Sequence, residues 1–219
     1  MSDVSLPGDW LERLARVPQS AKPEDLSRFL PPEEGGRPSA VLMLFGVDDD
    51  GRPDVLLTQR ADTMRSHPGQ VSFPGGSLDE VDDGPAACAI REAVEETGLD
   101  GDGVDVLGEL PALYLPPSGF VVTPVLGWWR VQSPVSAVDP AEVARVVRVP
   151  LDELLDPDNR ITTRHPSGFV GPAFTVRGLF VWGFTAGLLS RVLALAGLEV
   201  PWPTERVADL PPDVLARLQ

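Results

Sequence analysis

The chain has 219 residues, of which 42% are hydrophobic, so it is long enough to bury a core and is globular rather than disordered. Its net charge of −15 at pH 7 argues against a nucleic-acid-binding protein, which needs a basic surface. A single cysteine, Cys88, excludes an internal disulfide framework and favours the cytoplasm, and no apolar run is long enough for a membrane span. A single lysine among many arginines indicates a GC-rich bacterial genome.

The N-terminal part predicts a short extension followed by a hairpin. Gly8–Val17 has the spacing of a short amphipathic helix, and the Pro/Glu/Gly-rich stretch Pro31–Pro38 predicts a domain edge. We therefore expect residues 1–38 to be an N-terminal extension. Ala40–Val47 is almost continuously apolar, which favours a central strand, and Val55–Gln59 reads as the strand that returns after a turn.

A helix rich in glutamate is expected after the glycine turn Gly75-Gly76. The run Asp82-Asp83-Gly84-Pro85 predicts its start, with an Asx cap followed by proline in the first turn, and Gly98 predicts its end. At about 100° per residue, its three glutamates project from one side of the helix. The opposite side is expected to pack into the core with Ala86, Ile90, Ala93, Val94 and Thr97.

The three glutamates of this helix, Glu92, Glu95 and Glu96, point to a metal. Like charges on one face repel each other, so something must neutralise them, and a hard divalent cation, Mg²⁺ or Mn²⁺, is the natural candidate. Arg91 lies four residues before Glu95 and is expected to pair with it. The glycine turn leaves its backbone free to approach the metal and a phosphate.

The rest of the chain predicts alternating strands and helices, hence an α/β fold. We expect strands over Val104–Leu115, Phe120–Val131 and Val143–Val149, a brief helix over Leu151–Leu155, a hairpin of Ile161–Thr163 with Phe174–Val176, and a long buried helix over Leu179–Leu195. The proline-rich tail from Pro201 is expected to be loosely held. Residues 39–197 are the expected catalytic domain and residues 198–219 a C-terminal tail.

The helix region resembles the Nudix box. Arg91 to Leu99 follows the pattern REUxEExGU, in which U is aliphatic, with Ala93 as a small U. Seven residues separate Arg91 from Asp83, which stands where the general pattern has glutamate, and the spacer from Gly76 is six residues rather than five. The resemblance implies a Nudix α/β/α sandwich with a mixed sheet, a catalytic loop–helix–loop and a long C-terminal helix.

The preceding residues resemble one branch of that family, the coenzyme A diphosphatases. Leu56 to Ala61, Arg65, Gly69 and Phe73 to Gly76 follow LLTxR(S/A)x3Rx3Gx3FPGG without a gap. That branch also carries the longer spacer and the aspartate. Later segments resemble it as well, so the likeness covers roughly residues 38 to 195.

The expected roles combine the residues with the resemblance. Glu92 and Glu96 are the main candidate metal ligands, Glu95 completes the site or shares bridging waters, and Arg91 braces it. The backbone of Gly75 or Gly76 would add a carbonyl ligand, and these glycines with Arg60 and Arg65 are the candidate substrate-binding residues. The general base is either a glutamate of the helix or Glu142, which the EVxxV pattern of the family places in a later loop.

The resemblance implies hydrolysis of coenzyme A or acyl-coenzyme A to adenosine 3′,5′-bisphosphate and 4′-phosphopantetheine. One alternative is another nucleoside diphosphate derivative, such as ADP-ribose or NADH. A second is a Nudix module that senses a nucleotide without catalysis, although a pure binder has no need for the repelling glutamates. The partner is in each case a small molecule, and a homodimer is compatible with these expectations.

Overall fold

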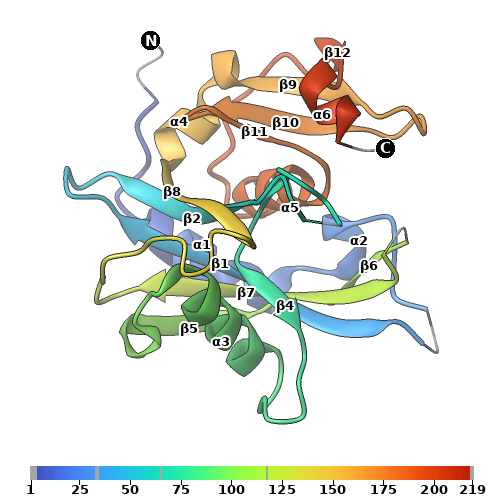
Figure 1. Ribbon diagram of the computed structural model, residues 1–219. Coiled ribbons are helices and arrows are strands. Elements are labelled where there is room, and N and C mark those ends of the chain that lie inside the picture. Colours follow the sequence, from blue (N-terminus) through green and yellow to red (C-terminus); the bar gives the residue numbers. More distant parts are fainter. Residues whose placement is uncertain (1–3, 33–34, 65, 117, 218–219) are drawn as a thin grey trace.

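The computed structural model describes residues 4–32, 35–64, 66–116 and 118–217 of the chain (Figure 1). The helices are α1 (Trp10–Ser20), α2 (Pro23–Leu26), α3 (Pro85–Thr97), α4 (Leu151–Leu155), α5 (Gly183–Leu195) and α6 (Pro212–Ala216). The strands are β1 (Arg37–Val47), β2 (Pro53–Arg60), β3 (Val71–Ser72), β4 (Gly75–Ser77), β5 (Val104–Glu109), β6 (Leu113–Leu115), β7 (Phe120–Trp129), β8 (Val143–Pro150), β9 (Arg160–Arg164), β10 (Val170–Val176), β11 (Leu179–Val181) and β12 (Val207–Asp209). Two 3₁₀ turns cover Gly101–Gly103 and Pro157–Asn159.

A mixed sheet forms the centre of the molecule. Its main path is β3-β2-β1-β7-β5, with β4 beside β1, β6 beside β7 and β8 beside β2. Strands β1 and β7 are parallel, whereas β2 is antiparallel to β1. A second sheet, β11-β10-β9-β12, lies beyond α5, and α3 lies on the opposite side of the central sheet (Figure 1). The expected α/β class, with its mixed sheet and a helix on each side, is confirmed.

Strand β1 shows why this sheet is buried on both faces. Successive side chains of a strand point to opposite faces, so its apolar run divides into two sets. Leu42 and Leu44 pack in the cluster that includes Ala93 of α3, and Met43 and Phe45 pack in the cluster that includes α5. All four of these strand residues are fully buried. The predicted hairpin is also confirmed, because Phe45 of β1 is paired with Val55 of β2.

The N-terminal helices pack into the same core. Helix α1 begins at Trp10, two residues after the predicted start at Gly8, and runs on to Ser20. Its Leu14 and Val17 are buried with Leu26 of α2 against residues of α5. The division into an extension of residues 1–38, a domain of residues 39–197 and a tail stays a prediction. Among the described residues, no helix is long and apolar enough to cross a bilayer.

The predicted long C-terminal helix begins later than expected. Leu179–Val181 is strand β11, paired with β10, and the helix starts only at Gly183. Gly178 has a φ of +72°, which allows the tight turn that places Leu179 opposite Val176. A short apolar run does not by itself distinguish a buried strand from a helix.

Two other predictions are corrected. Val104–Leu115 is not one strand: it is divided into β5 and β6, with Pro111, which has no N–H to donate, between them. The tail from Pro201 is not loosely held, because β12 pairs with β9 and α6 follows it. Leu210 and Val214 are buried there, so the tail is part of the packed structure.

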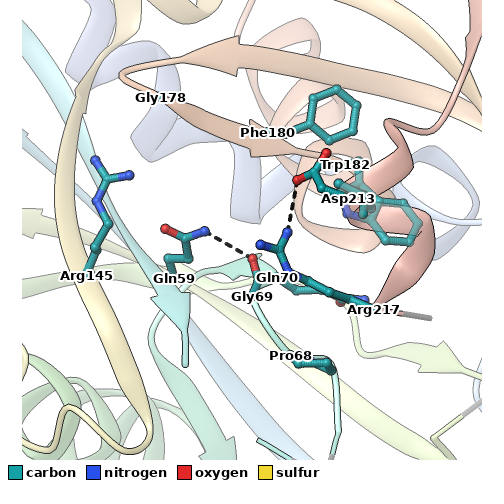
Figure 2. Close-up of a pocket in the computed structure, with 11 residues that line it drawn as sticks. Gln59, Pro68, Gly69, Gln70, Arg145, Gly178, Phe180, Trp182, Asp213 and Arg217 are labelled. Carbon is teal, nitrogen blue, oxygen red and sulfur yellow. Dashed lines mark hydrogen bonds and ion pairs between the residues drawn. The ribbon is translucent and has the colours of Figure 1, made fainter. Parts of the chain in front are cut away.

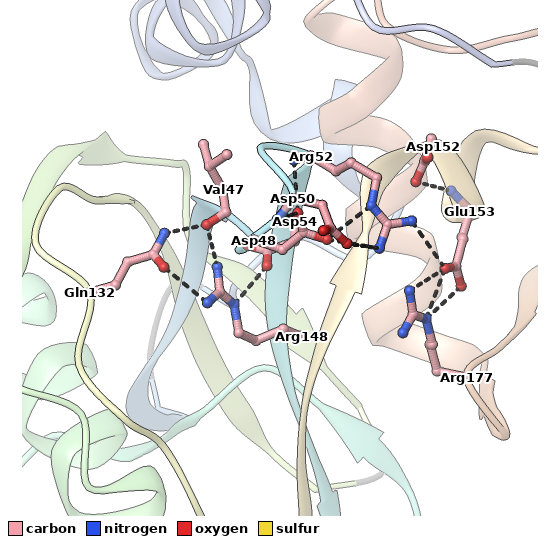
Figure 3. A network of polar contacts seen from close by, with 10 residues as sticks. All are labelled: Val47, Asp48, Asp50, Arg52, Asp54, Gln132, Arg148, Asp152, Glu153 and Arg177. Atoms are coloured by element: carbon pink, nitrogen blue, oxygen red, sulfur yellow. Dashed lines mark hydrogen bonds and ion pairs between the residues drawn. The ribbon is translucent and has the colours of Figure 1, made fainter.

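A polar network joins the β1–β2 turn to β8, as Figure 3 shows. Asp48 accepts hydrogen bonds from Arg52, and Asp54 forms an ion pair with Arg148 in which Nε and Oδ2 are 2.7 Å apart. The side chain of Asp54 is only 1% exposed. Arg148 also donates to the carbonyl of Val47 at 2.7 Å, so it ties three strands together.

Candidate active site

Helix α3 carries the glutamates and is fixed by its small residues. Cys88, Ala89, Ala93 and Thr97 are its buried residues, and they let the helix approach β1 closely. Burial raises the pKa of the Cys88 thiol to about 11, so the thiol is protonated and unreactive at neutral pH. Val94, predicted on the core side, is 38% exposed.

The two ends of α3 differ in how well they were predicted. Gly98 ends the helix in the left-handed conformation, as expected. The Asx cap is wrong: the cap residue is Gly84, with a φ of 103°, and in the first turn the N–H of Ala86 donates to the carboxylate of Glu109 at 3.2 Å. The carboxylate of Asp82 instead accepts hydrogen bonds from the N–H of Asp79 and from the guanidinium of Arg91.

Arg91 is the centre of the acidic group. Its Nε and Nη2 each donate to Asp82 at 2.9 Å, and its Nη1 donates to Glu92 at 3.0 Å and to Glu95 at 3.1 Å. The predicted pair of Arg91 with Glu95 is therefore confirmed, and Arg91 also forms ion pairs with Asp82, Glu92 and, at 3.7 Å, Asp79. The hydrogen bonds from Arg91 lower the pKa of Asp82 to about 2, so this pair stays charged throughout the neutral range.

The glycine turn lies directly against the acidic face. β4 pairs with β1, with Gly75 opposite Val41 and Gly76 opposite Ala40. A Cβ at Gly76 would overlap the carboxylate of Glu92, and a Cβ at Gly75 would overlap the carbonyl oxygen of Ala40. At Gly75 the obstacle is backbone, so only glycine fits there, whereas a side chain at Gly76 would displace the carboxylate of Glu92.

Glu96 is the most perturbed of the three glutamates. Burial raises its pKa to about 7, the charge of Glu92 adds to the rise, and Arg60 opposes it. Its Oε2 is buried with no hydrogen-bond partner among the described residues. A buried carboxylate oxygen without a donor is a costly arrangement that a bound cation would relieve.

These observations fit an open magnesium-type site rather than a preformed cage. In the part of the chain that the structure describes, no three acidic, histidine or cysteine side chains are gathered around one point. Mg²⁺ is usually held by one or two carboxylates together with waters and substrate phosphates. Glu92 and Glu96, one turn apart, supply such a pair, whereas Glu95 is 59% exposed and held by Arg91.

Arg60 and Glu142 lie near this group. Arg60 acts electrostatically on Glu96, and its Nε is buried without a hydrogen-bond partner among the described residues. The carbonyl of Glu142 accepts the N–H of Ala61 at 2.8 Å, and the charge of Glu142 also acts on Glu96. Arg65 lies outside the described residues. The roles of all these residues stay predictions.

Asp82 is a residue of the site that the spacing of the Nudix box did not predict. A spacer of seven residues before Arg91 points to Asp83, yet the carboxylate that Arg91 holds at 2.9 Å is that of Asp82. The neighbouring acids Asp82-Asp83 were visible in the sequence, but only the turn before the helix decides which one faces Arg91.

Replacing Arg91 by lysine is expected to lower turnover about tenfold, in the range found when residues that orient metal ligands are changed. Lysine keeps the charge but not the planar fork that reaches Asp82, Glu92 and Glu95 together. Steady-state kinetics at saturating Mg²⁺ measures the effect. Arg13→Lys, which changes an exposed pair with Asp9, is the matched control and should leave turnover unchanged. Full activity of Arg91→Lys would contradict an orienting role for Arg91.

Comparison with known proteins identifies the family. The model of the NUDIX domain matches residues 36–167, more than half of the chain. A protein of Cronobacter sakazakii described as an uncharacterized Nudix hydrolase, NudL, is 42% identical over 156 residues, which cover 68% of this chain and 78% of that protein. The NudL of Citrobacter koseri is 40% identical over 194 residues, which cover 85% of this chain and 92% of that protein.

Solved structures of Nudix proteins are also similar. The crystal structure of the M. smegmatis Nudix hydrolase RenU has 20% sequence identity and a TM-score of 0.49, covering 77% of this chain and 91% of that one. The family model and the curated relatives are what identify this protein: the chain belongs to the Nudix family of hydrolases.

Proposed function

We propose that this Nudix hydrolase cleaves the phosphoanhydride of coenzyme A or acyl-coenzyme A, releasing adenosine 3′,5′-bisphosphate and 4′-phosphopantetheine. The observation that carries the proposal is the position of the residues that follow the coenzyme A diphosphatase pattern. The positive charge of Arg60 and a backbone hydrogen bond from Gly75 both stabilise the charged form of Glu96, and Gly76 lies against the carboxylate of Glu92. The signature before α3 and the acids on α3 therefore form one group.

Each charged residue has a definite task in this proposal. A Mg²⁺ or Mn²⁺ ion held by Glu92 and Glu96 would neutralise phosphate charge and acidify the attacking water. Arg91 fixes the carboxylates of Glu92 and Glu95. Arg60 would offer a phosphate oxygen its Nε, which has no hydrogen-bond partner among the described residues. These local cations matter because the net charge of −15 would otherwise repel an anionic substrate.

The proposed general base is Glu142 or a glutamate of α3. Glu142 is exposed, and it begins the segment that leads into β8, close enough for its charge to raise the pKa of Glu96. An exposed carboxylate next to the site is free to accept a proton from water.

A substrate panel tests the proposal. The protein is mixed with Mg²⁺ and coenzyme A, acyl-coenzyme A, ADP-ribose, NADH or capped RNA, and the products are separated by chromatography. We expect hydrolysis of coenzyme A or its acyl form, and none in the presence of EDTA. Hydrolysis of ADP-ribose but not of coenzyme A would overturn the substrate, and no turnover of any compound would favour the nucleotide sensor.

The remaining expectations stay predictions. A small molecule rather than a nucleic acid is the proposed partner, in keeping with the acidic charge. The cytoplasmic location, the homodimer and the choice between Mg²⁺ and Mn²⁺ are each open to direct measurement.

A further inference from the structure

A cavity of about 210 Å³ lies between the loop that carries Pro68 and Gly69 and helix α6 (Figure 2). Gln59 of β2, Gly69 of the loop, Arg145 of β8, Trp182 before α5 and Arg217 after α6 all line it. These residues come from distant parts of the sequence, so the cavity exists only in the folded chain. Its C-terminal wall lies outside the segment that the family model matches, residues 36–167.

The cavity adjoins the candidate active site through β2. Gln59 and Arg60 are consecutive, and the pairing of β2 with β8 shifts register between them, so they do not follow simple strand alternation. The carbonyl of Gln70, which also lines the cavity, accepts the N–H of Arg60 at 2.9 Å. Gln59 lines the cavity, while Arg60 acts on Glu96. Arg145 is paired with Gln59 across β2 and β8, so its side chain is on the cavity side. A substrate whose phosphoanhydride reaches Arg60 would place a neighbouring group at this cavity.

One positive charge at the cavity, that of Arg145, has no carboxylate paired with it among the described residues, and this charge favours an anion. Its lining contains two arginines, Arg145 and Arg217, and one aspartate, Asp213, in a chain whose net charge is −15. Arg217 is already paired with Asp213 at 3.1 Å and with Asp62 at 3.0 Å. Arg145 is exposed and donates to the carbonyl of Arg177 at 3.1 Å. Within the described residues no carboxylate forms an ion pair with Arg145, so its charge is available to a ligand.

The size of the cavity limits what it takes. Pockets for whole ligands are about 300–1,000 Å³, so a cavity of about 210 Å³ accepts one group of a larger molecule. One face of the Trp182 ring is already covered by the His165 ring, with the centroids 5.9 Å apart. The group that the cavity is best suited to bind is therefore a compact anion rather than a nucleobase.

We propose that this cavity binds a phosphate monoester on the nucleoside end of the substrate, and that Arg145 is the residue that recognises it. A guanidinium matches the oxygens of a phosphate with two parallel hydrogen bonds. The inference rests on the proposed function: in coenzyme A, the group is the 3′-phosphate of the ribose. Arg145 is then a specificity-determining residue and takes no part in the chemical step.

The test compares coenzyme A with dephospho-coenzyme A, which lacks only the 3′-phosphate. For the unchanged protein we expect a KM about tenfold lower for coenzyme A, the size of effect typical of a charge-assisted hydrogen bond. Arg145→Gln should raise the KM for coenzyme A about tenfold, with kcat and the KM for dephospho-coenzyme A unchanged. Arg145→Lys should keep part of the preference. Arg191→Gln, which removes an exposed arginine of α5 outside the cavity, is the matched control and should change neither KM.

A structural role of Arg145 gives a different result. If Arg145 only supports the turn at Arg177, Arg145→Gln would change both KM values by the same factor, and the inference would be overturned. Equal KM values for the two substrates in the unchanged protein would overturn it too, while the proposed hydrolysis of coenzyme A would stand.

A binding measurement separates this inference from the proposed function. Calorimetry with adenosine 3′,5′-bisphosphate and with AMP needs no turnover. If neither coenzyme is hydrolysed, the proposed function fails, but bisphosphate binding that exceeds AMP binding and is lost in Arg145→Gln would still support the phosphate site. Equal binding of the two nucleotides would overturn it.

Discussion

Replacing Glu96 by glutamine is expected to lower kcat about a hundredfold or more while the fold stays intact. Glutamine has nearly the same size, so it keeps the packing at the end of α3 but removes the charge that would hold a cation. The Oε2 atom of Glu96 is buried without a hydrogen-bond partner among the described residues. No protein contact there compensates its burial, so we expect this oxygen to bind the cation. A hundredfold loss corresponds to about 3 kcal/mol of transition-state stabilisation. Steady-state kinetics across a Mg²⁺ titration measures it.

The stability of this variant checks that the loss is chemical. Burial and the charge of Glu92 raise the pKa of Glu96 from 4.5 to about 7 in the folded, metal-free protein. A folded-state pKa above the unfolded value means that ionising the group opposes folding, so stability falls as the pH rises from about 4.5 to about 7. Glutamine does not ionise. At pH 8 in EDTA, Glu96→Gln should therefore melt at or above the temperature of the unchanged protein.

Glu95→Gln is the matched control on the same helix. The side chain of Glu95 is 59% exposed and held by Arg91, so its loss should lower kcat less than tenfold. Full activity of Glu96→Gln would remove Glu96 from the metal site. An equal loss in both variants would mean that the two glutamates contribute alike.

The parts of the fold that the sequence predicted are those with a clear local pattern. The apolar run Ala40–Val47 lies in the buried strand β1, and α3 ends at Gly98 in the left-handed conformation. Both features depend only on residues close together in the sequence, so a local pattern predicts them. The ion pair of Arg91 with Glu95 was predictable for the same reason, since residues four apart on a helix are neighbours.

The parts that the sequence did not predict depend on distant contacts. Leu179–Val181 is as apolar as the helix that follows it, and only its pairing with β10 makes it a strand. Asp82 rather than Asp83 faces Arg91 because of the way the turn before α3 folds. The cavity at Arg145 required β2, β8 and α6 to meet, which no local pattern encodes.

Replacing Arg148 by methionine is expected to destabilise the protein by about 3 kcal/mol at pH 7. Methionine can fill much of the same space, but it leaves the carboxylate of Asp54 without its partner, and that side chain is 1% exposed. Breaking a buried ion pair on one side costs about 3–5 kcal/mol, because the remaining charge is neither solvated nor paired. The lost hydrogen bond to Val47 and the stacking of Arg148 on Trp129 add to the effect. Urea denaturation measures the change.

The pH dependence shows how much of this loss is due to the charge. Burial raises the pKa of Asp54 above 3.8 even with Arg148 beside it, and removing Arg148 raises it further. Because the folded-state pKa exceeds the unfolded one, ionised Asp54 opposes folding as the pH rises from 3.8 through the folded pKa. The destabilisation of Arg148→Met should therefore be largest at pH 7 and shrink towards pH 4.5.

A surface pair provides the comparison for this variant. Arg130, which follows the end of β7, forms an ion pair with Asp105 of β5, but their side chains are 51% and 47% exposed. Arg130→Met should cost less than about 1 kcal/mol, because water solvates the carboxylate that remains. If Arg148→Met loses the same stability at pH 7 and at pH 4.5, the loss comes from the contacts with Val47 and Trp129. A loss that depends on pH means that Asp54 tolerates its burial only because Arg148 stays charged beside it.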